Sequence, residues 1–89
     1  MSSPTLLSMA LFSIWDNKAK FHSTPWFSPN DDTAIREFVR VVNDGSSAIN
    51  ASPDDYTLFR IGTFDSDTGL ITAEDKKLLS LGTDVRQPV

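Results

Sequence analysis

The stretch from Tyr56 to Thr72 constrains the fold more than any other part of the sequence. It reads YTLFRIGTFDSDTGLIT, two runs rich in β-branched and aromatic residues separated by a polar segment that ends in glycine. Such runs are typical of strands, and Asp, Ser and Gly between them are typical of hairpin turns. Residues 56–64 and 69–72 are therefore predicted to form two antiparallel strands joined by a turn.

The polar segment Asp65-Ser66-Asp67-Thr68-Gly69 has two interpretations. Its acids and glycine resemble the start of a calcium loop, with Glu74 as the distal ligand. However, the third oxygen ligand before the glycine is missing, and Glu74 comes too early in the sequence. A hairpin turn uses the same residues, because aspartate bonds to its own backbone and glycine accepts a positive φ. We interpret the segment as a turn and expect no metal site.

Upstream of this hairpin, the sequence predicts a strand, an extended segment and one helix. Residues 9–16 form the strand, which turns at 16–18 into an extended segment at 19–27, where Pro25 requires an edge or a loop. Residues 33–43 carry apolar side chains at helical spacing, and Asn30, Asp31 and Asp32 before them provide N-cap oxygens. The helix is expected to stop at Asn43-Asp44-Gly45.

The predicted fold class is α+β. After a loop with a short helical turn near Pro53 and the hairpin, a short strand or turn is expected within 78–85. The elements would form a small antiparallel sheet of about four strands, in the order ββαββ, with one packed helix. We expect residues 1–8 to be a flexible lead-in, 9–85 to be a single domain and 86–89 to be a tail.

Both main strands carry bulky apolar residues on both faces. In the first strand, Met9, Leu11 and Trp15 lie on one face and Phe12 and Ile14 on the other. In the second strand, Tyr56 and Leu58 lie on one face and Phe59 and Ile61 on the other. One helix covers only one face of a small sheet, and a face exposed to water would be polar. The second face is therefore expected to pack on the tail around Leu78, Leu79 and Leu81, or on a second subunit. We favour a homodimer.

Composition narrows the remaining possibilities. The chain has 89 residues, a net charge of −4 and no cysteine, so neither a disulfide nor a thiolate zinc site is available. The first 16 residues lack a basic n-region and a long apolar run, so we expect no signal peptide, no membrane span and a cytoplasmic location. His22 is the single histidine, and no nucleophile motif or phosphate loop is present. We therefore expect no enzyme, no catalytic residues and no cofactor.

Aromatic residues alternating with lysines raise the possibility of single-stranded DNA binding by stacking. The candidate contacts are Lys18, Lys20, Trp26, Arg36 and Arg40. Trp26, next to Pro25, is the aromatic expected to be exposed if DNA is bound, although we favour the alternative in which Trp26 and Phe27 cap the end of the core. The acidic balance opposes DNA binding and favours a protein-interaction module. Basic side chains gathered on one face would favour DNA, and scattered ones would favour a protein partner.

Three segments together resemble a known family. They are SIWDNKAKFHSTPWFSPNDDTAIREFVRVVND, SPDDYTLFRIGTFDSDTGLI and SLGTDV, spanning residues 13–85. The chain resembles the small nonstructural protein of gokushovirus-type microviruses, which are phages with single-stranded DNA genomes. The resemblance implies a protein made in the infected bacterial cytoplasm that acts in viral DNA synthesis or packaging, through single-stranded DNA or through a viral or host replication protein. It brings no catalytic residues.

Overall fold

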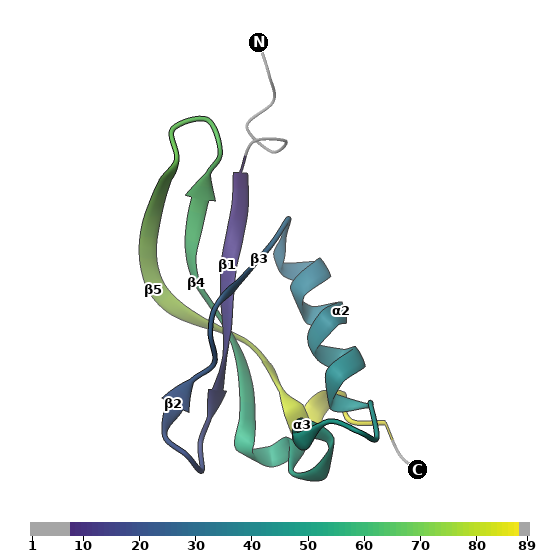
Figure 1. Cartoon of the computed structure of the whole chain (residues 1–89). Helices are drawn as coiled ribbons and strands as arrows, with labels where there is room; N and C mark the ends of the chain where they lie inside the picture. Colours follow the sequence, from purple (N-terminus) through teal and green to yellow (C-terminus); the bar gives the residue numbers. More distant parts are fainter. Residues whose placement is uncertain (1–7, 88–89) are drawn as a thin grey trace.

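The computed structural model describes residues 8–87, so most of the predicted lead-in and the last two residues lie outside it (Figure 1). The chain forms an antiparallel sheet with one main helix, as the predicted α+β class requires. The strands are β1 (Ser8–Asp16), β2 (Phe21–His22), β3 (Trp26–Ser28), β4 (Tyr56–Asp65) and β5 (Leu70–Leu81), and the helices are α2 (Asp31–Val42), α3 (Ala48–Ala51), η1 (Pro53–Asp55) and α4 (Gly82–Val85).

The sheet has the order β2-β1-β4-β5, and β3 also pairs with β1. Strand β1 is therefore central, with β4 on one side and the short strands β2 and β3 sharing the other. The observed element order differs from ββαββ because the segment at 19–27 divides into two strands. Pro25 lies in the break between them, where a residue without a backbone N–H does not interrupt a hydrogen-bond ladder.

Strand β5 is much longer than predicted. The sequence indicates a strand only at 69–72 and a separate element near 78–85, but β5 runs unbroken from Leu70 to Leu81. Of the charged residues between the two apolar runs, Lys77 is opposite Arg60 on β4, whereas residues 74–76 have no partners of their own and form a bulge opposite Ile61. The strand continues through the bulge because both flanking segments pair with β4, and a second register shift lies between Leu58 and Phe59.

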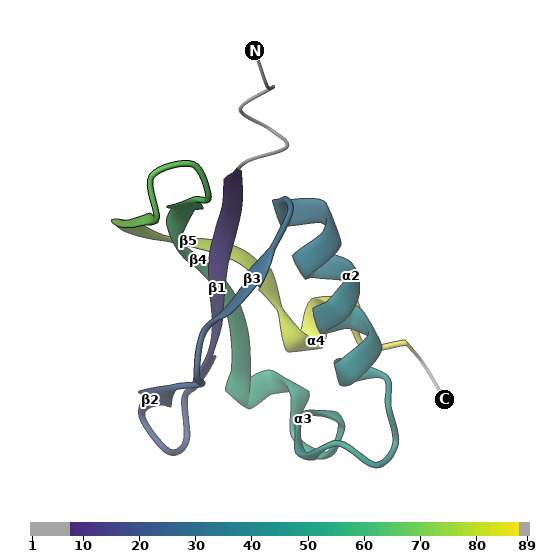
Figure 2. The same ribbon diagram turned by 45° about the horizontal axis from the view of Figure 1, so that its top comes forward.

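Helix α2 covers one face of the sheet. The Asn30 side chain accepts a hydrogen bond from the backbone N–H of Thr33 at 2.8 Å, so the predicted N-cap is confirmed. The buried residues of the helix pack against the sheet and form a core that contains Ala10, Phe12, Ala34, Phe38, Val42 and Leu58. Figures 1 and 2 both place α2 along one side of the sheet, with α3 and α4 near its C-terminal end.

The predicted hairpin turn is confirmed. The backbone N–H of Gly69 donates to the carbonyl oxygen of Asp65 at 2.7 Å, and Gly69 has a φ of 76°. The Asp65 carboxylate accepts a hydrogen bond from the backbone N–H of Asp67 at 2.9 Å. The aspartate and the glycine thus have the backbone roles that a turn requires.

Candidate nucleic-acid interface

The sheet face opposite α2, which we call the open face, is lined by alternate residues of the strands. On β1, Ala10 and Phe12 belong to the core, so Leu11, Ser13 and Trp15 point the other way. The apolar and aromatic side chains of this face are Met9, Leu11, Trp15, Phe27, Phe59, Phe64, Ile71 and Leu78. No helix covers this face within residues 8–87. Leu78 lies within β5 and is 53% exposed, so the C-terminal segment does not fold over this face as one alternative predicted.

One end of the open face holds an aromatic site, formed by Trp15, His22, Phe59 and Lys76. The His22 ring lies between the other two, with centroid distances of 4.9 Å to Trp15 and 5.7 Å to Phe59. The Lys76 ammonium is 5.9 Å from the Trp15 ring centroid and 5.4 Å from that of Phe59, within cation–π range. This site combines flat apolar rings with a positive charge.

His22 is held in the aromatic site as a neutral imidazole. Burial of the ring, followed by the charge of Lys76, lowers the pKa of His22 below its ordinary value of 6.5. The Lys76 ammonium lies 3.4 Å from Nε2, which must accept, so Nδ1 carries the hydrogen and donates to Ser13 Oγ at 2.8 Å. Protonation of His22 would place a second positive charge beside Lys76.

A second aromatic pair lies farther along the same face. The rings of Phe27 and Phe64 are 5.3 Å apart and nearly perpendicular, and Phe27 is 47% exposed. Phe64 is opposite Met9 on β1 and Phe59 is opposite Ser13, so four strand positions, or roughly 13 Å, separate the two groups of rings. The open face therefore presents two separate aromatic surfaces.

The basic residues are divided between the two sides of the molecule. Lys18 and Lys20 lie in the turn between β1 and β2, directly beside the aromatic site in the chain. Arg36 and Arg40 are exposed on α2, on the covered side of the sheet. Arg60 is also on that side, where it pairs with Asp31 at 2.9 Å and with Glu74 at 3.0 Å. Lys18 and Lys20 thus lie in the turn that joins the strands of Trp15 and His22, whereas Arg36 and Arg40 lie on α2.

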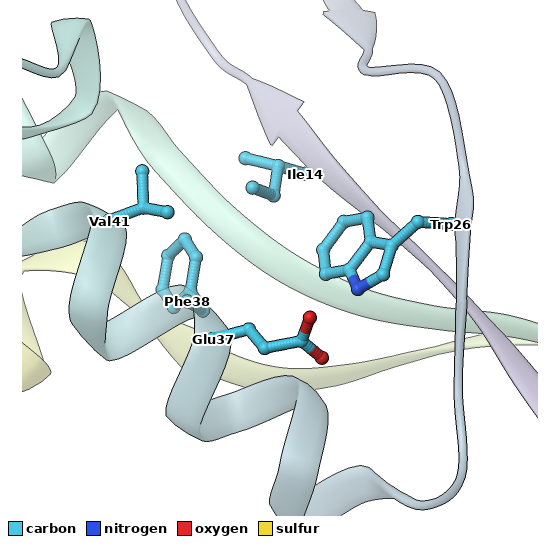
Figure 3. A pocket seen from close by; sticks show the side chains of 5 residues that line it. All are labelled: Ile14, Trp26, Glu37, Phe38 and Val41. Carbon is cyan, nitrogen blue, oxygen red and sulfur yellow. The ribbon is translucent and has the colours of Figure 1, made fainter.

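Trp26, the aromatic expected to be exposed, is partly buried against the core. Its ring centroid lies 6.1 Å from that of Phe12. It lines a hollow of about 250 Å³ together with Ile14, Glu37, Phe38 and Val41, and the side chains of Glu37 and Trp26 approach each other there (Figure 3). Ser28 Oγ donates to the Glu37 carboxylate at 3.0 Å. A phosphate would be repelled by Glu37, so this hollow does not suit DNA.

The sequence singled out Lys18 and Lys20 but missed Phe59, Phe64 and Lys76. The signal for the two phenylalanines was present, because their strand carries apolar residues on both faces. No such signal was present for Lys76, because the strand predicted at 69–72 was not expected to extend to residue 76. A charged residue becomes a candidate contact only when the fold places it over the rings.

A family model described as phage ORF5 protein matches residues 9–85 of the chain. The chain belongs to the phage ORF5 protein family. This confirms the phage origin that the sequence resemblance implied, and the match covers every strand and helix described above apart from the first residue of β1. Neither a curated protein nor a solved structure matches this phage ORF5 protein. Within its described part, no helix is long and apolar enough to cross a membrane.

Proposed function

We propose that this phage ORF5 protein is a nonstructural accessory protein of a gokushovirus-type microvirus. It works in the cytoplasm of the infected bacterium and assists synthesis or packaging of the viral genome by binding single-stranded DNA. The open face is the binding surface, and the bases stack on its aromatic rings. The protein holds DNA and performs no catalysis.

The observation that carries this proposal is the aromatic open face with Lys76 above it. Exposed rings on a sheet stack on bases of any sequence, and each stacked base contributes about 1–3 kcal/mol. Duplex DNA offers no free base faces, so this surface favours single strands. Phe27, at 47% exposure, is the most accessible ring of the face.

Electrostatics contributes less than stacking. Lys76 lies over the rings of the aromatic site and Lys18 and Lys20 lie in the turn between β1 and β2, whereas Arg60 and Lys77 are paired with carboxylates on the other side. If three lysines contact phosphates, the slope of log affinity against log salt is about −2, using roughly 0.7 per phosphate for single strands. The acidic remainder of the molecule keeps duplex binding weak.

A fluorescence titration with oligothymidine at low and moderate salt tests the proposal. We expect the single strand to bind well ahead of duplex DNA of the same length. Phe27→Ala should weaken binding about 5- to 150-fold, the equivalent of one lost stacking contact, and Phe27→Tyr should retain it. No binding at low salt, or equal binding to duplex, would overturn the proposal.

Adjacent lysines provide a matched control for the choice of face. Lys76 lies over the rings of the open face, and Lys77 points to the covered side, 3.5 Å from the Asp31 carboxylate. Lys76→Ala should lower affinity and reduce the salt slope by about 0.7, while Lys77→Ala should leave both nearly unchanged. Equal losses from the two variants would contradict binding at the open face.

A second candidate function is a protein-interaction module that redirects a viral or host replication protein without contacting DNA. The hollow around Trp26 favours it, because apolar walls from Ile14 and Val41 next to the Glu37 carboxylate suit a lysine or arginine side chain of a protein. The division of basic residues between two sides of the sheet points the same way. If oligothymidine does not bind in the titration, the protein-interaction function becomes the favoured one.

A further inference from the structure

Strand β5 is a long sheet edge without a partner on its outer side. Among the described strands it pairs only with β4, and its residues are exposed except for Leu79 and Ser80, which are partly buried. Four of its apolar side chains are among the most exposed of the molecule, namely Leu70 at 65%, Ile71 at 61%, Leu78 at 53% and Leu81 at 39%. An edge of this length and apolarity is a ready site for pairing with another strand.

The charges of β5 are complementary to those of a second copy of itself. At the middle of the strand, Glu74 and Asp75 precede Lys76 and Lys77, between apolar residues on both sides. When two such strands run antiparallel, the acidic half of one meets the basic half of the other. Two parallel copies would instead place like charges opposite each other, which is destabilising.

Symmetry limits the antiparallel register to a few choices. A two-fold axis perpendicular to the sheet places one residue opposite its own copy. An axis at Asp75 would set Glu74 opposite Lys76, but Glu74 reaches Arg60 on the covered side and Lys76 lies over the rings of the open face. With Lys76 on the axis, Asp75 of each copy is opposite Lys77 of the other, which gives two opposite-charge pairs for one like-charge contact.

The lysines of β5 do not block this edge. Lysines on an edge strand normally discourage pairing when they project along it. Here Lys76 bends over the rings of the open face, and Lys77 reaches Asp31 on the covered side. The opposite edge of the sheet is different, since it consists of two short strands interrupted at Pro25.

We propose that this chain forms a homodimer in which β5 pairs antiparallel with β5 of a second copy, centred on Lys76. The twelve residues of β5 span at most about 40 Å at the usual strand rise, and less where the strand bulges. Rotation about an axis perpendicular to the sheet keeps both copies of α2 on one side and both open faces on the other. The open faces of the two copies then form one continuous surface for DNA. This consequence rests on the proposed function, whereas the pairing itself does not.

Sedimentation equilibrium of the full chain, without DNA, tests the pairing. We expect a dimer at micromolar concentration. D75K gives each strand an excess of positive charge at its centre, and K76E/K77E gives an excess of negative charge, so each variant should repel its own copy. Because each change occurs twice in the interface, the dimer dissociation constant should rise at least about tenfold.

Mixing the two variants provides the decisive result. Their strand centres carry opposite charges, so an equimolar mixture should form a dimer although each variant alone is monomeric. Asp54→Lys makes the same charge change as D75K at an exposed position outside the sheet and should dimerise normally. Circular dichroism identifies any variant that fails to fold, and Asp75→Asn then replaces D75K, with a smaller loss expected.

Three outcomes would overturn the inference: a monomeric unaltered chain, a dimer insensitive to both charge variants, or folded monomeric variants that do not associate when mixed. The proposed function is judged separately. A dimer that binds no single-stranded DNA would contradict the DNA proposal alone, and a monomer that binds it would contradict the dimer alone. If both hold, the DNA length covered per complex should be about twofold shorter for D75K than for the unaltered chain.

Discussion

The two faces of the sheet are built by the same strands and have opposite properties. On the covered face, Phe12, Phe38 and Leu58 are at most 1% exposed, and α2 excludes water from them. On the open face, Phe27 and Leu78 are about half exposed, although they are as apolar as the core residues. The difference shows that a domain of this size can derive its stability from one face and leave an equally apolar second face available for binding.

The largest expected difference in stability is between two truncations, one of a side chain on each face. Phe38→Ala should destabilise the protein by about 3–5 kcal/mol, because it leaves a cavity under α2 that the helix cannot fill. Phe27→Ala should cost about 1 kcal/mol or less, because the ring is already half in water. Urea denaturation followed by circular dichroism measures both values.

Similar losses of stability from Phe38→Ala and Phe27→Ala would contradict this difference between the faces. They would show that the open face is part of a second core, covered by another copy of the chain in solution. Repeating the Phe27→Ala measurement over a range of protein concentrations separates the two cases, because only the stability of an oligomer depends on concentration.

A smaller effect on stability is expected at Gly62 on β4, because the neighbouring strand β5 lies too close to leave room for a side chain. A Cβ at Gly62 would lie 2.7 Å from the backbone oxygen of Thr72 on β5. Gly62→Ala should therefore cost about 1–3 kcal/mol through displacement of β5 from β4. Gly45→Ala, where a Cβ meets nothing within 4 Å, is the matched control and should change stability by about 0.5 kcal/mol or less.

The smallest effect is a pH dependence that arises from His22. Its pKa is lowered in the folded protein by burial and by the nearby Lys76 charge, so the unfolded chain binds more protons as the pH falls through 6.5. Stability should therefore decrease on acidification from about pH 7.5 to about pH 5.5, whereas DNA affinity should increase as the site gains charge. His22→Gln should remove this part of both dependences, and an unchanged profile would contradict the assignment.

The sequence predicted those parts of the fold that depend on local patterns. The helix with its Asn30 cap and the turn ending at Gly69 follow from residues within a few positions of each other. The full length of β5 did not, because Glu74 to Lys77 resemble a loop and belong to the strand only because the segments on both sides pair with β4. The candidate site shows the same division. Lys18 and Lys20 could be proposed from the sequence, whereas Lys76 required knowledge of its position over the Trp15 ring.

The pairing of β1 with β4 has a consequence for how the protein is made. Asp16 is opposite Tyr56 and Ser8 is opposite Asp65, so β1 must wait for at least 40 further residues before its central partner exists. At a synthesis rate of about 5–20 residues per second, that delay is roughly 2–8 s. During this interval β1 can pair with β2 and β3 but not with β4, while β4 and β5 can pair with each other as soon as both have been synthesised. Strand β1 thus waits for its longest partner, and crowding of nascent chains would affect this strand before β4 or β5.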